Sequence, residues 1–163
     1  GIIHAYCEAY NFKSWIFRFV STLGPHYSHG HVIDFVKKLL KNKNKINVLG
    51  NGNQKKSYQH VYDCVEAMLF AVQKEKKKVN VFNLGTNEYI TVKKSLQIIC
   101  KKLNLNPKKN FTDEKRGWIG DIPFIFLDTK KIRKLGWKNK FSIKQSVEET
   151  VDWLLKNKWI LKN

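Results

Sequence analysis

The sequence predicts an α/β fold in which short strands alternate with helices along the chain. Two observations carry this prediction: short runs rich in aromatic and β-branched residues, and amphipathic helical patterns between them. A third is the composition, with 42% hydrophobic and 27% charged residues in a chain of 163, which is enough for a hydrophobic core. Disordered, collagenous and low-complexity classes are therefore excluded.

The first part of the chain predicts a helix, a strand and a second helix. Residues 1–11 carry apolar side chains at helical spacing. Residues 14–20 are aromatic and β-branched without alternation, which is typical of a strand covered on both faces of a parallel sheet. Apolar residues from Val32 to Leu40 then follow the i, i+3, i+4, i+7, i+8 pattern of an amphipathic helix.

The middle of the chain repeats the alternation. Residues 46–49 predict a short strand, which ends at a turn where Gly50 and Gly52 can adopt positive φ. An apolar stripe that includes Val65 and Leu69 predicts an amphipathic helix over residues 61–72. A strand over residues 79–84 follows.

The last part predicts three helices with recognisable ends. Thr91 is a suitable N-cap for a helix that runs to residue 103. After an extended piece at residues 124–127, Asp128 can cap a brief helix that Gly136 ends. Ser142 opens a Ser-x-x-Gln capping box, and the helix it begins runs to residue 154.

The formal net charge of +18 raises nucleic acid as a partner. Only three of the 31 basic residues are arginines, and the 28 lysines are spread along the chain. Base recognition favours the planar fork of arginine, so we interpret the lysines as solvated surface and expect no nucleic-acid partner.

No run is long or apolar enough for a membrane span, and no signal segment opens the chain. The three cysteines are far apart and form no C-x-x-C pair, which favours buried thiols in a reducing compartment. The sequence therefore predicts a cytoplasmic protein without membrane contact. Because the chain opens at Gly1 inside a helical pattern, we expect a piece of a longer protein.

Two groups of reactive residues give only weak indications of a functional site. His26, His29, His31 and Asp34 lack the second ligand pair of a structural zinc site, so we expect no metal. Cys64 follows His60 by four residues, but no other feature supports a nucleophile there.

Two loops are candidates for phosphate contact. Residues 50–58 combine glycines with lysines, although the spacing is not that of a P-loop. If this segment is extended, Lys55 and Lys56 point to opposite faces, and one of them can serve a pocket. Residues 116–121 join an arginine, two glycines and Asp121. From the residues alone, either loop is equally compatible with an ordinary surface turn.

Six segments in one order resemble the C-terminal half of the NAD-dependent epimerase/dehydratases, a branch of the extended short-chain dehydrogenase/reductase family, with UDP-glucose 4-epimerase as the nearest type. They span essentially the whole chain. In order they are residues 17–25, the helix after residue 31, residues 48–61 with Asp63, residues 83–85, residues 120–123 and residues 131–137.

The resemblance implies the C-terminal part of a Rossmann-type parallel sheet plus a small mixed α/β substrate-binding domain. Residues 1–25 would be the tail of the NAD-binding domain and residues 26–163 mostly the substrate domain, with residues 57–84 returning to the Rossmann sheet. It also implies NAD as cofactor, which takes a hydride from the sugar and returns it to the other face of the sugar. The Gly-rich fingerprint and the catalytic Tyr-x-x-x-Lys pair are expected upstream of Gly1, so this chain alone is expected to be inactive.

The resemblance also assigns roles to single residues. Phe19 and Val20 would border the nicotinamide, and Lys56 would replace an arginine on the diphosphate. Trp118 stands where the family has another arginine, for which Arg116 would substitute from two residues back. The positions matched to substrate contacts are Ser21, His31, Val32, Asn47, Leu49, Lys56, Tyr58, Arg116 and Asp121.

The implied partners are a UDP-sugar and, in the complete protein, a second copy that pairs through helices including residues 1–11. A 4,6-dehydratase or a decarboxylase of the same family is the alternative to the epimerase. A basic module that binds nucleic acid is the distant alternative from another class.

Overall fold

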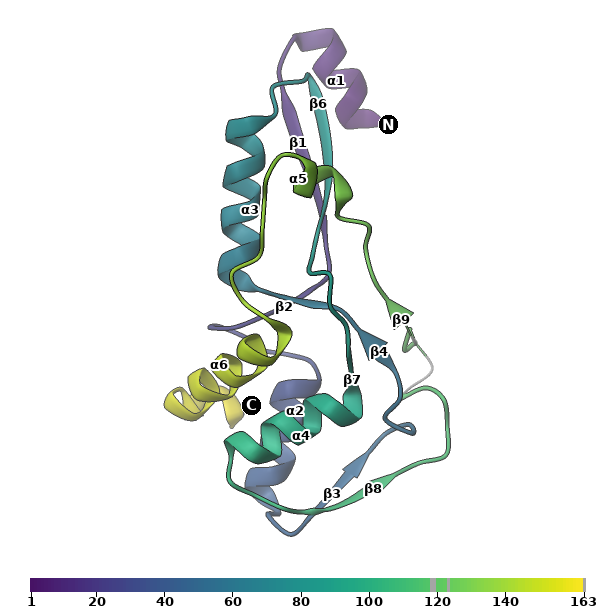
Figure 1. Cartoon of the computed structure of the whole chain (residues 1–163), viewed down its shortest axis with the longest axis vertical. Coiled ribbons are helices and arrows are strands. Elements are labelled where there is room, and N and C mark those ends of the chain that lie inside the picture. The colour runs from purple at the N-terminus through teal and green to yellow at the C-terminus, as the bar shows by residue number, and fades with distance from the viewer. Residues whose placement is uncertain (118–119, 123, 163) are drawn as a thin grey trace.

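The computed structural model describes residues 1–117, 120–122 and 124–162 and has two lobes (Figure 1). One, which we call the strand-pair lobe, comprises α1 (Ile2–Tyr10), β1 (Ser14–Phe19), α3 (Val61–Lys74), β6 (Val79–Leu84) and α5 (Lys130–Lys134). The other, the helical lobe, comprises α2 (His31–Lys41), β3 (Lys45–Val48), α4 (Val92–Lys102), β8 (Lys108–Phe111), α6 (Ile143–Lys156) and the 3-10 turn η1 (Lys158–Leu161). Mixed α/β architecture with parallel strands confirms the predicted fold class.

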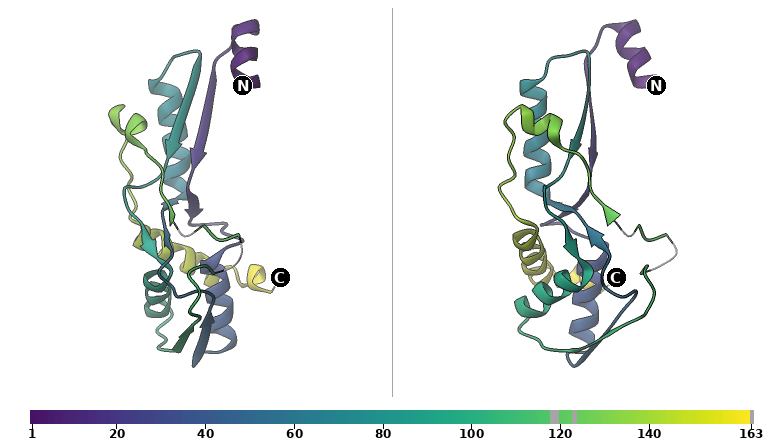
Figure 2. Two further views of the ribbon diagram at one scale, coloured as in Figure 1. Left: turned by 90° about the vertical axis from the view of Figure 1, so that its right-hand side faces the viewer. Right: turned by 45° about the vertical axis from the view of Figure 1, so that its right-hand side comes forward.

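The strand-pair lobe is built on β1 and β6, which pair in parallel from Ser14↔Val79 to Phe19↔Leu84. The helix α3 packs along this pair through the small residues Cys64, Ala67 and Ala71. Small side chains let the helix backbone approach the strands closely. Figure 2 shows α3 running beside the two strands and α1 at their far end.

The predicted apolar stripe of α3 was partly wrong. Val65 is 49% exposed and Leu69 is 59% exposed, because the small residues and not the large ones form the buried face. In α1, Cys7 is buried while Ile2 and Tyr10 are exposed. Pairing of this helix with a second copy stays a prediction.

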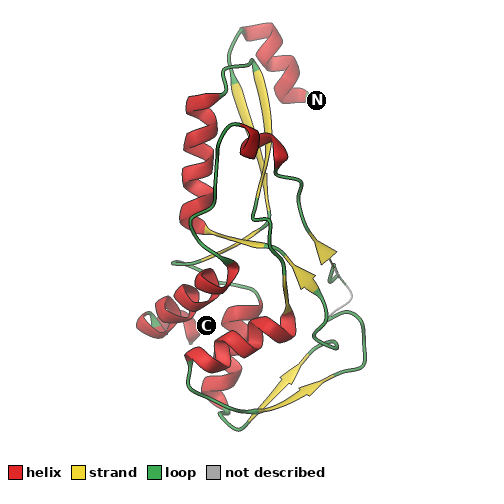
Figure 3. Cartoon of the chain, in the orientation of Figure 1, coloured by secondary structure: helices red, strands yellow, loops and turns green. Residues whose placement is uncertain are grey.

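The helical lobe holds the larger core, which α2, α4 and α6 enclose (Figure 3). The brief helix α5 has Thr129 as its N-cap in place of the predicted Asp128, whose Oδ1 accepts from the Lys130 amide at 2.9 Å. The other two predicted caps are confirmed. Thr91 Oγ1 accepts a hydrogen bond from the Lys94 amide at 3.1 Å, and Ser142 and Gln145 form the reciprocal capping box. The helices α3 and α6 have 14 residues each, and no helix in the described part of the chain is long and apolar enough to cross a membrane.

Short strands join the two lobes. In parallel pairing, β2 (Ser21–Leu23) lies beside β5 (Tyr58–His60). The strand β4 (Lys55–Lys56) pairs antiparallel with β7 (Ile90–Thr91) and parallel with β9 (Phe124–Ile125). The turn before β4 has Gly50 at φ 79° and Gly52 at φ 76°, as expected.

Candidate functional site

Two adjoining cavities lie where the short strands meet the helical lobe. The first has a volume of about 340 Å³ and the second about 710 Å³. Five residues line both cavities, namely Gly30, His31, Lys56, Tyr58 and Asp121. These shared residues come from the start of α2, from β4 and β5, and from the loop before β9, so the fold brings together segments that are distant in sequence.

Lys56 supplies the positive charge at this boundary. Its Nζ lies 2.6 Å from Asp121 Oδ1 and also donates to the Ile122 carbonyl. The second Asp121 oxygen accepts from the Gly117 amide at 3.1 Å. Because both side chains are largely buried, water screens the pair weakly. Lys56 is therefore held at a fixed place beside both cavities.

Lys55 faces the other way, as alternation along a strand predicts. Its Nζ lies 5.1 Å from the centre of the Tyr89 ring. Lys56 and Tyr58, two residues apart, both line the cavities. The predicted division of the two lysines between opposite faces is confirmed.

His31 forms a neutral polar wall between the cavities. Its Nε2 lies 2.7 Å from Ser95 Oγ, and its Nδ1 lies 3.1 Å from the Tyr58 hydroxyl. Burial, together with the nearby charge of Lys56, lowers the pKa of His31 to about 4, against an opposing effect of Asp34. Burial also raises the pKa of Tyr58. Both rings are therefore uncharged at neutral pH.

The first cavity has apolar walls from Phe35, Val48, Leu49 and Val92. Leu49 is 61% exposed, so an apolar side chain stands uncovered at this cavity. Gln54 also lines it and is buried, and its Oε1 has no hydrogen-bond partner within the described residues. Sequence reasoning missed Gln54, because a single amide in a polar turn carries no distinguishing pattern.

The lining of the second cavity includes Phe19, residues 21–23 of β2 and the loop residues 25–30. The loop histidines have separate neighbours: His26 packs on Trp153, and His29 stacks on Tyr27. In the part of the chain that is described, no three His, Cys, Asp or Glu residues come together as a metal site would require.

Four of the predicted site residues do not line either cavity. Val20 and Val32 are buried in the interior, and Asn47 accepts a hydrogen bond from Asn110 on β8. The Arg116 backbone lies against Gly50, near the first cavity. The prediction for Trp118 falls outside the described residues.

The Tyr-x-x-x-Lys spacing of the family's catalytic pair also occurs within this chain, from Tyr89 to Lys93. It is not built as one helix, since Tyr89 precedes β7 and Lys93 lies in the first turn of α4. Neither residue lines a cavity, and Lys93 Nζ lies over the Phe111 ring. This pair is therefore not a candidate for catalysis at the two cavities.

A family model described as GDP-mannose 4,6 dehydratase matches residues 1–150. The chain belongs to this family. The family assignment made from six short segments, to the NAD-dependent epimerases and dehydratases, is thereby confirmed.

The relatives of this chain include both epimerases and dehydratases. A putative UDP-glucose 4-epimerase from Methanocaldococcus jannaschii is 28% identical over 159 residues, which cover 95% of this chain and 50% of the relative. A dTDP-D-glucose 4,6-dehydratase from Bos taurus is 29% identical over 163 residues and is covered to 44%. The chain thus spans about half the length of the curated relatives it matches.

Solved structures of the family share the fold. A crystal structure of UDP-galactose 4-epimerase has a TM-score of 0.81 at 29% identity, with 97% of this chain and 50% of that chain covered. A dTDP-glucose 4,6-dehydratase from Bacillus anthracis in complex with NAD has a TM-score of 0.76 at 21% identity, which shows likeness of fold. The match covers 99% of this chain and 50% of the Bacillus anthracis chain.

Proposed function

We propose that this chain is the substrate-binding half of an NAD-dependent nucleotide-sugar epimerase of the UDP-glucose 4-epimerase type. In this proposal the nucleoside occupies the first cavity, the diphosphate lies at Lys56, and the sugar enters the second cavity. The observation that carries it is the boundary between the cavities, where the largely buried Lys56, held by Asp121, lines both of them.

The chemistry of the walls supports this order. A flat base can cover the exposed Leu49 and pack on Val92, which removes apolar surface from water. Lys56 offers a point charge to phosphate oxygens, and the uncharged His31 and Tyr58 beside it offer hydrogen bonds without a further charge. Ser21 and the loop histidines of the second cavity can hydrogen-bond sugar hydroxyls.

NAD would supply hydride chemistry when bound, and we propose that it meets the sugar at the Phe19 side of the second cavity. Phe19 is 54% exposed at the end of β1, which leaves an aromatic face uncovered there. We propose that the other half of the complete protein supplies most of the NAD site and the catalytic pair. We also propose a cytoplasmic location, supported by three free, buried cysteines.

Calorimetric titration of the chain with UDP, uridine and UDP-glucose tests the binding part of the proposal. We expect UDP to bind at least about tenfold more tightly than uridine, because charge-assisted contacts to phosphate contribute roughly 1.5–3 kcal/mol. Equal affinities for UDP and uridine would contradict a diphosphate at Lys56.

A nucleotide-sugar 4,6-dehydratase is the second candidate, favoured by the family model and by relatives that carry that name. Product analysis with the complete protein separates the two reactions. An epimer of equal mass identifies the epimerase, whereas loss of one water from the sugar identifies the dehydratase.

A further inference from the structure

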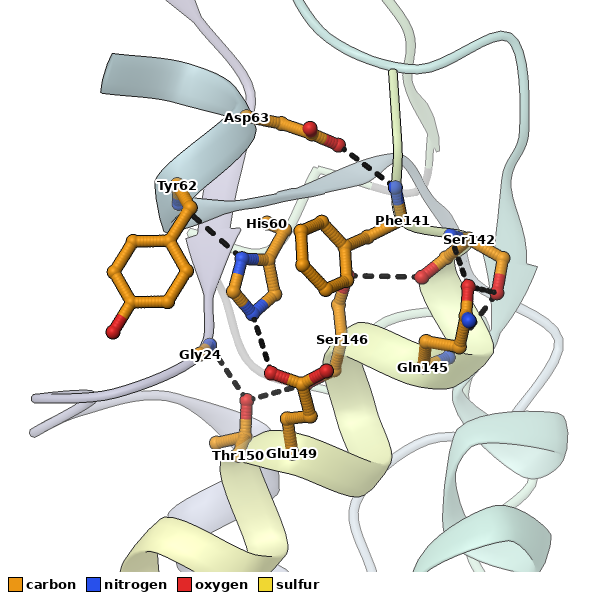
Figure 4. Close-up of polar contacts among 10 residues, drawn as sticks. All are labelled: Gly24, His60, Tyr62, Asp63, Phe141, Ser142, Gln145, Ser146, Glu149 and Thr150. Carbon is orange, nitrogen blue, oxygen red and sulfur yellow. Dashed lines mark hydrogen bonds and ion pairs between the residues drawn. The ribbon is translucent and has the colours of Figure 1, made fainter. Parts of the chain in front are cut away.

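Behind the second cavity, buried polar groups join β5, α3 and α6 around His60 (Figure 4). The ring is fully buried, and its Nδ1 accepts a hydrogen bond from the Tyr62 amide at 3.2 Å. An imidazole that accepts at Nδ1 carries its proton on Nε2. That Nε2 lies 3.2 Å from Glu149 Oε2 on α6, a close polar contact that falls short of hydrogen-bond geometry in the described part of the chain.

The segment that leads into α6 is fixed to the same place. Asp63, fully buried on α3, accepts from the backbone amides of Lys140 at 3.0 Å and Phe141 at 3.1 Å. The Phe141 ring then stacks on His60 with the ring centres 4.0 Å apart. His60 and Asp63 thus hold both the approach to α6 and its second turn.

In turn, α6 holds the loop that lines the second cavity. The Gly24 amide donates to Thr150 Oγ1 at 2.7 Å, and His26 packs on Trp153. Gly24 has φ +124°, and a Cβ there would come within 2.9 Å of His60 Nε2. The loop backbone therefore packs directly on the imidazole that Glu149 contacts.

None of the α6 residues lines either cavity in the described part of the chain. Glu149 has a side chain that is 44% exposed, yet it reaches inward to a buried ring. This contact joins α6 to β5. The strand β5 carries Tyr58 at the cavity boundary and His60 two residues later on the same face.

We propose that His60 and Glu149 are positioning residues for sugar binding, which rests on the function proposed above. Through Thr150 and Trp153, the contact between His60 and Glu149 fixes the loop from Gly24 to Gly30 in the shape that receives the sugar. The pair does not touch the nucleoside or the diphosphate. It therefore governs the additional affinity that the sugar gives to UDP-glucose over UDP.

Glu149→Met tests the proposal, because it removes the carboxylate beside His60 while keeping the volume and the helix propensity. Two readouts are used. The first readout is hydrogen–deuterium exchange of the amides of residues 22–31. The second is the ratio of the dissociation constants for UDP and UDP-glucose. Glu148→Met is the matched control, since it removes the same charge from the same helix and its carboxylate pairs with Lys144 instead.

We expect Glu149→Met to speed exchange in residues 22–31. We expect it to lower the ratio of the dissociation constants for UDP and UDP-glucose about fivefold, the cost of one lost polar contact, with UDP binding unchanged. Glu148→Met should match the wild-type chain. Glu149→Gln should restore both readouts, because its amide oxygen can take the place of the carboxylate oxygen beside His60 Nε2.

A merely structural contact would give a different result. A lower melting temperature with an unchanged ratio, or unchanged exchange in residues 22–31, would overturn the positioning role, as would equal losses for UDP and UDP-glucose. Failure of the proposed function shows separately, as absence of UDP binding by the wild-type chain, in which case a sugar-positioning role fails with it.

Discussion

Lys56 and Lys55 are adjacent in the chain but lie on opposite faces of β4. Comparing a substitution at each position therefore separates a local charge at the cavities from the overall charge of the chain. Lys56 lies at the boundary of both cavities, and Lys55 covers the Tyr89 ring on the opposite face of β4. We expect Lys56→Ala to weaken UDP binding by about tenfold or more, because it removes a charge-assisted contact. Titration calorimetry measures this directly.

Lys55→Ala provides the control, since it makes the same change in net charge one residue away. We expect it to alter the dissociation constant of UDP less than twofold, because exposed charges are screened by water and salt. Equal losses in both variants would mean that the lysines act only through the overall charge of the chain.

His31 makes the stability of the chain depend on pH. The pKa of His31 is about 4 in the folded chain and about 6.5 in an unfolded one, so the unfolded chain binds more protons between these values. The stabilisation is complete above about pH 6.5 and is lost as the pH falls toward 4. For this half-buried ring, we expect at most about 2 kcal/mol of loss from His31 between pH 7 and pH 5.

Urea unfolding of the wild-type chain and of His31→Gln at pH 7 and pH 5 measures this contribution. We expect the difference in unfolding free energy between the two pH values to be smaller in His31→Gln by about that amount. The same difference in both proteins would show that His31 does not titrate differently on folding.

At the scale of the elements, α3 reverses the usual expectation for an amphipathic helix. Its small residues face β1 and β6, whereas Val65 and Leu69 are exposed, and Met68 and Phe70 are only partly buried at the edge of the core. We expect Ala67→Leu to destabilise the chain by about 1–3 kcal/mol, because the close contact between helix and strands has no room for a larger side chain. Leu69→Gln should change stability by less than about 0.5 kcal/mol.

Thermal or urea unfolding of the two variants checks this assignment of faces. If Leu69→Gln proved the more damaging change, the large residues of α3 would have to be covered in solution, and the exposed stripe would be an interface.

The long elements were predictable because each has a local signal. The period of α2, the capping box of α6 and the parallel strand β6 were all recovered within a few residues. Strands of two or three residues, such as β4 and β7, have no period to detect and form only because distant segments pair with them. Local patterns alone therefore could not place the elements that build the site.

The same division applies to the site. Lys56 and Tyr58 were predictable from strand alternation combined with a family resemblance, because their geometry is local. Val32 and Asn47 came from the resemblance alone, and neither lines either of the two cavities: Val32 is buried, and Asn47 accepts from Asn110. Gln54 escaped notice because its importance depends on burial, which tertiary packing decides.

At the scale of the whole molecule, the net charge of +18 must be reconciled with a site for one small anion. The charge comes almost entirely from lysines, which hold water strongly and do not read bases with a planar fork. Arg133 is committed to internal contacts, since its guanidinium donates to Thr129 and Asn139 at 2.9 Å each. This distribution favours a solvated surface over a nucleic-acid interface.

The dependence of binding on salt separates the two alternatives. A surface that neutralises many phosphates releases many counterions, so its affinity for duplex DNA should fall steeply between about 50 and 200 mM salt. A site that meets a diphosphate with Lys56 alone should lose far less affinity for UDP over the same range. We therefore expect titrations at about 150 mM salt to give tighter binding of UDP than of duplex DNA. Tighter binding of DNA at that salt concentration would identify the lysine surface as the functional one and would refute the nucleotide-sugar site.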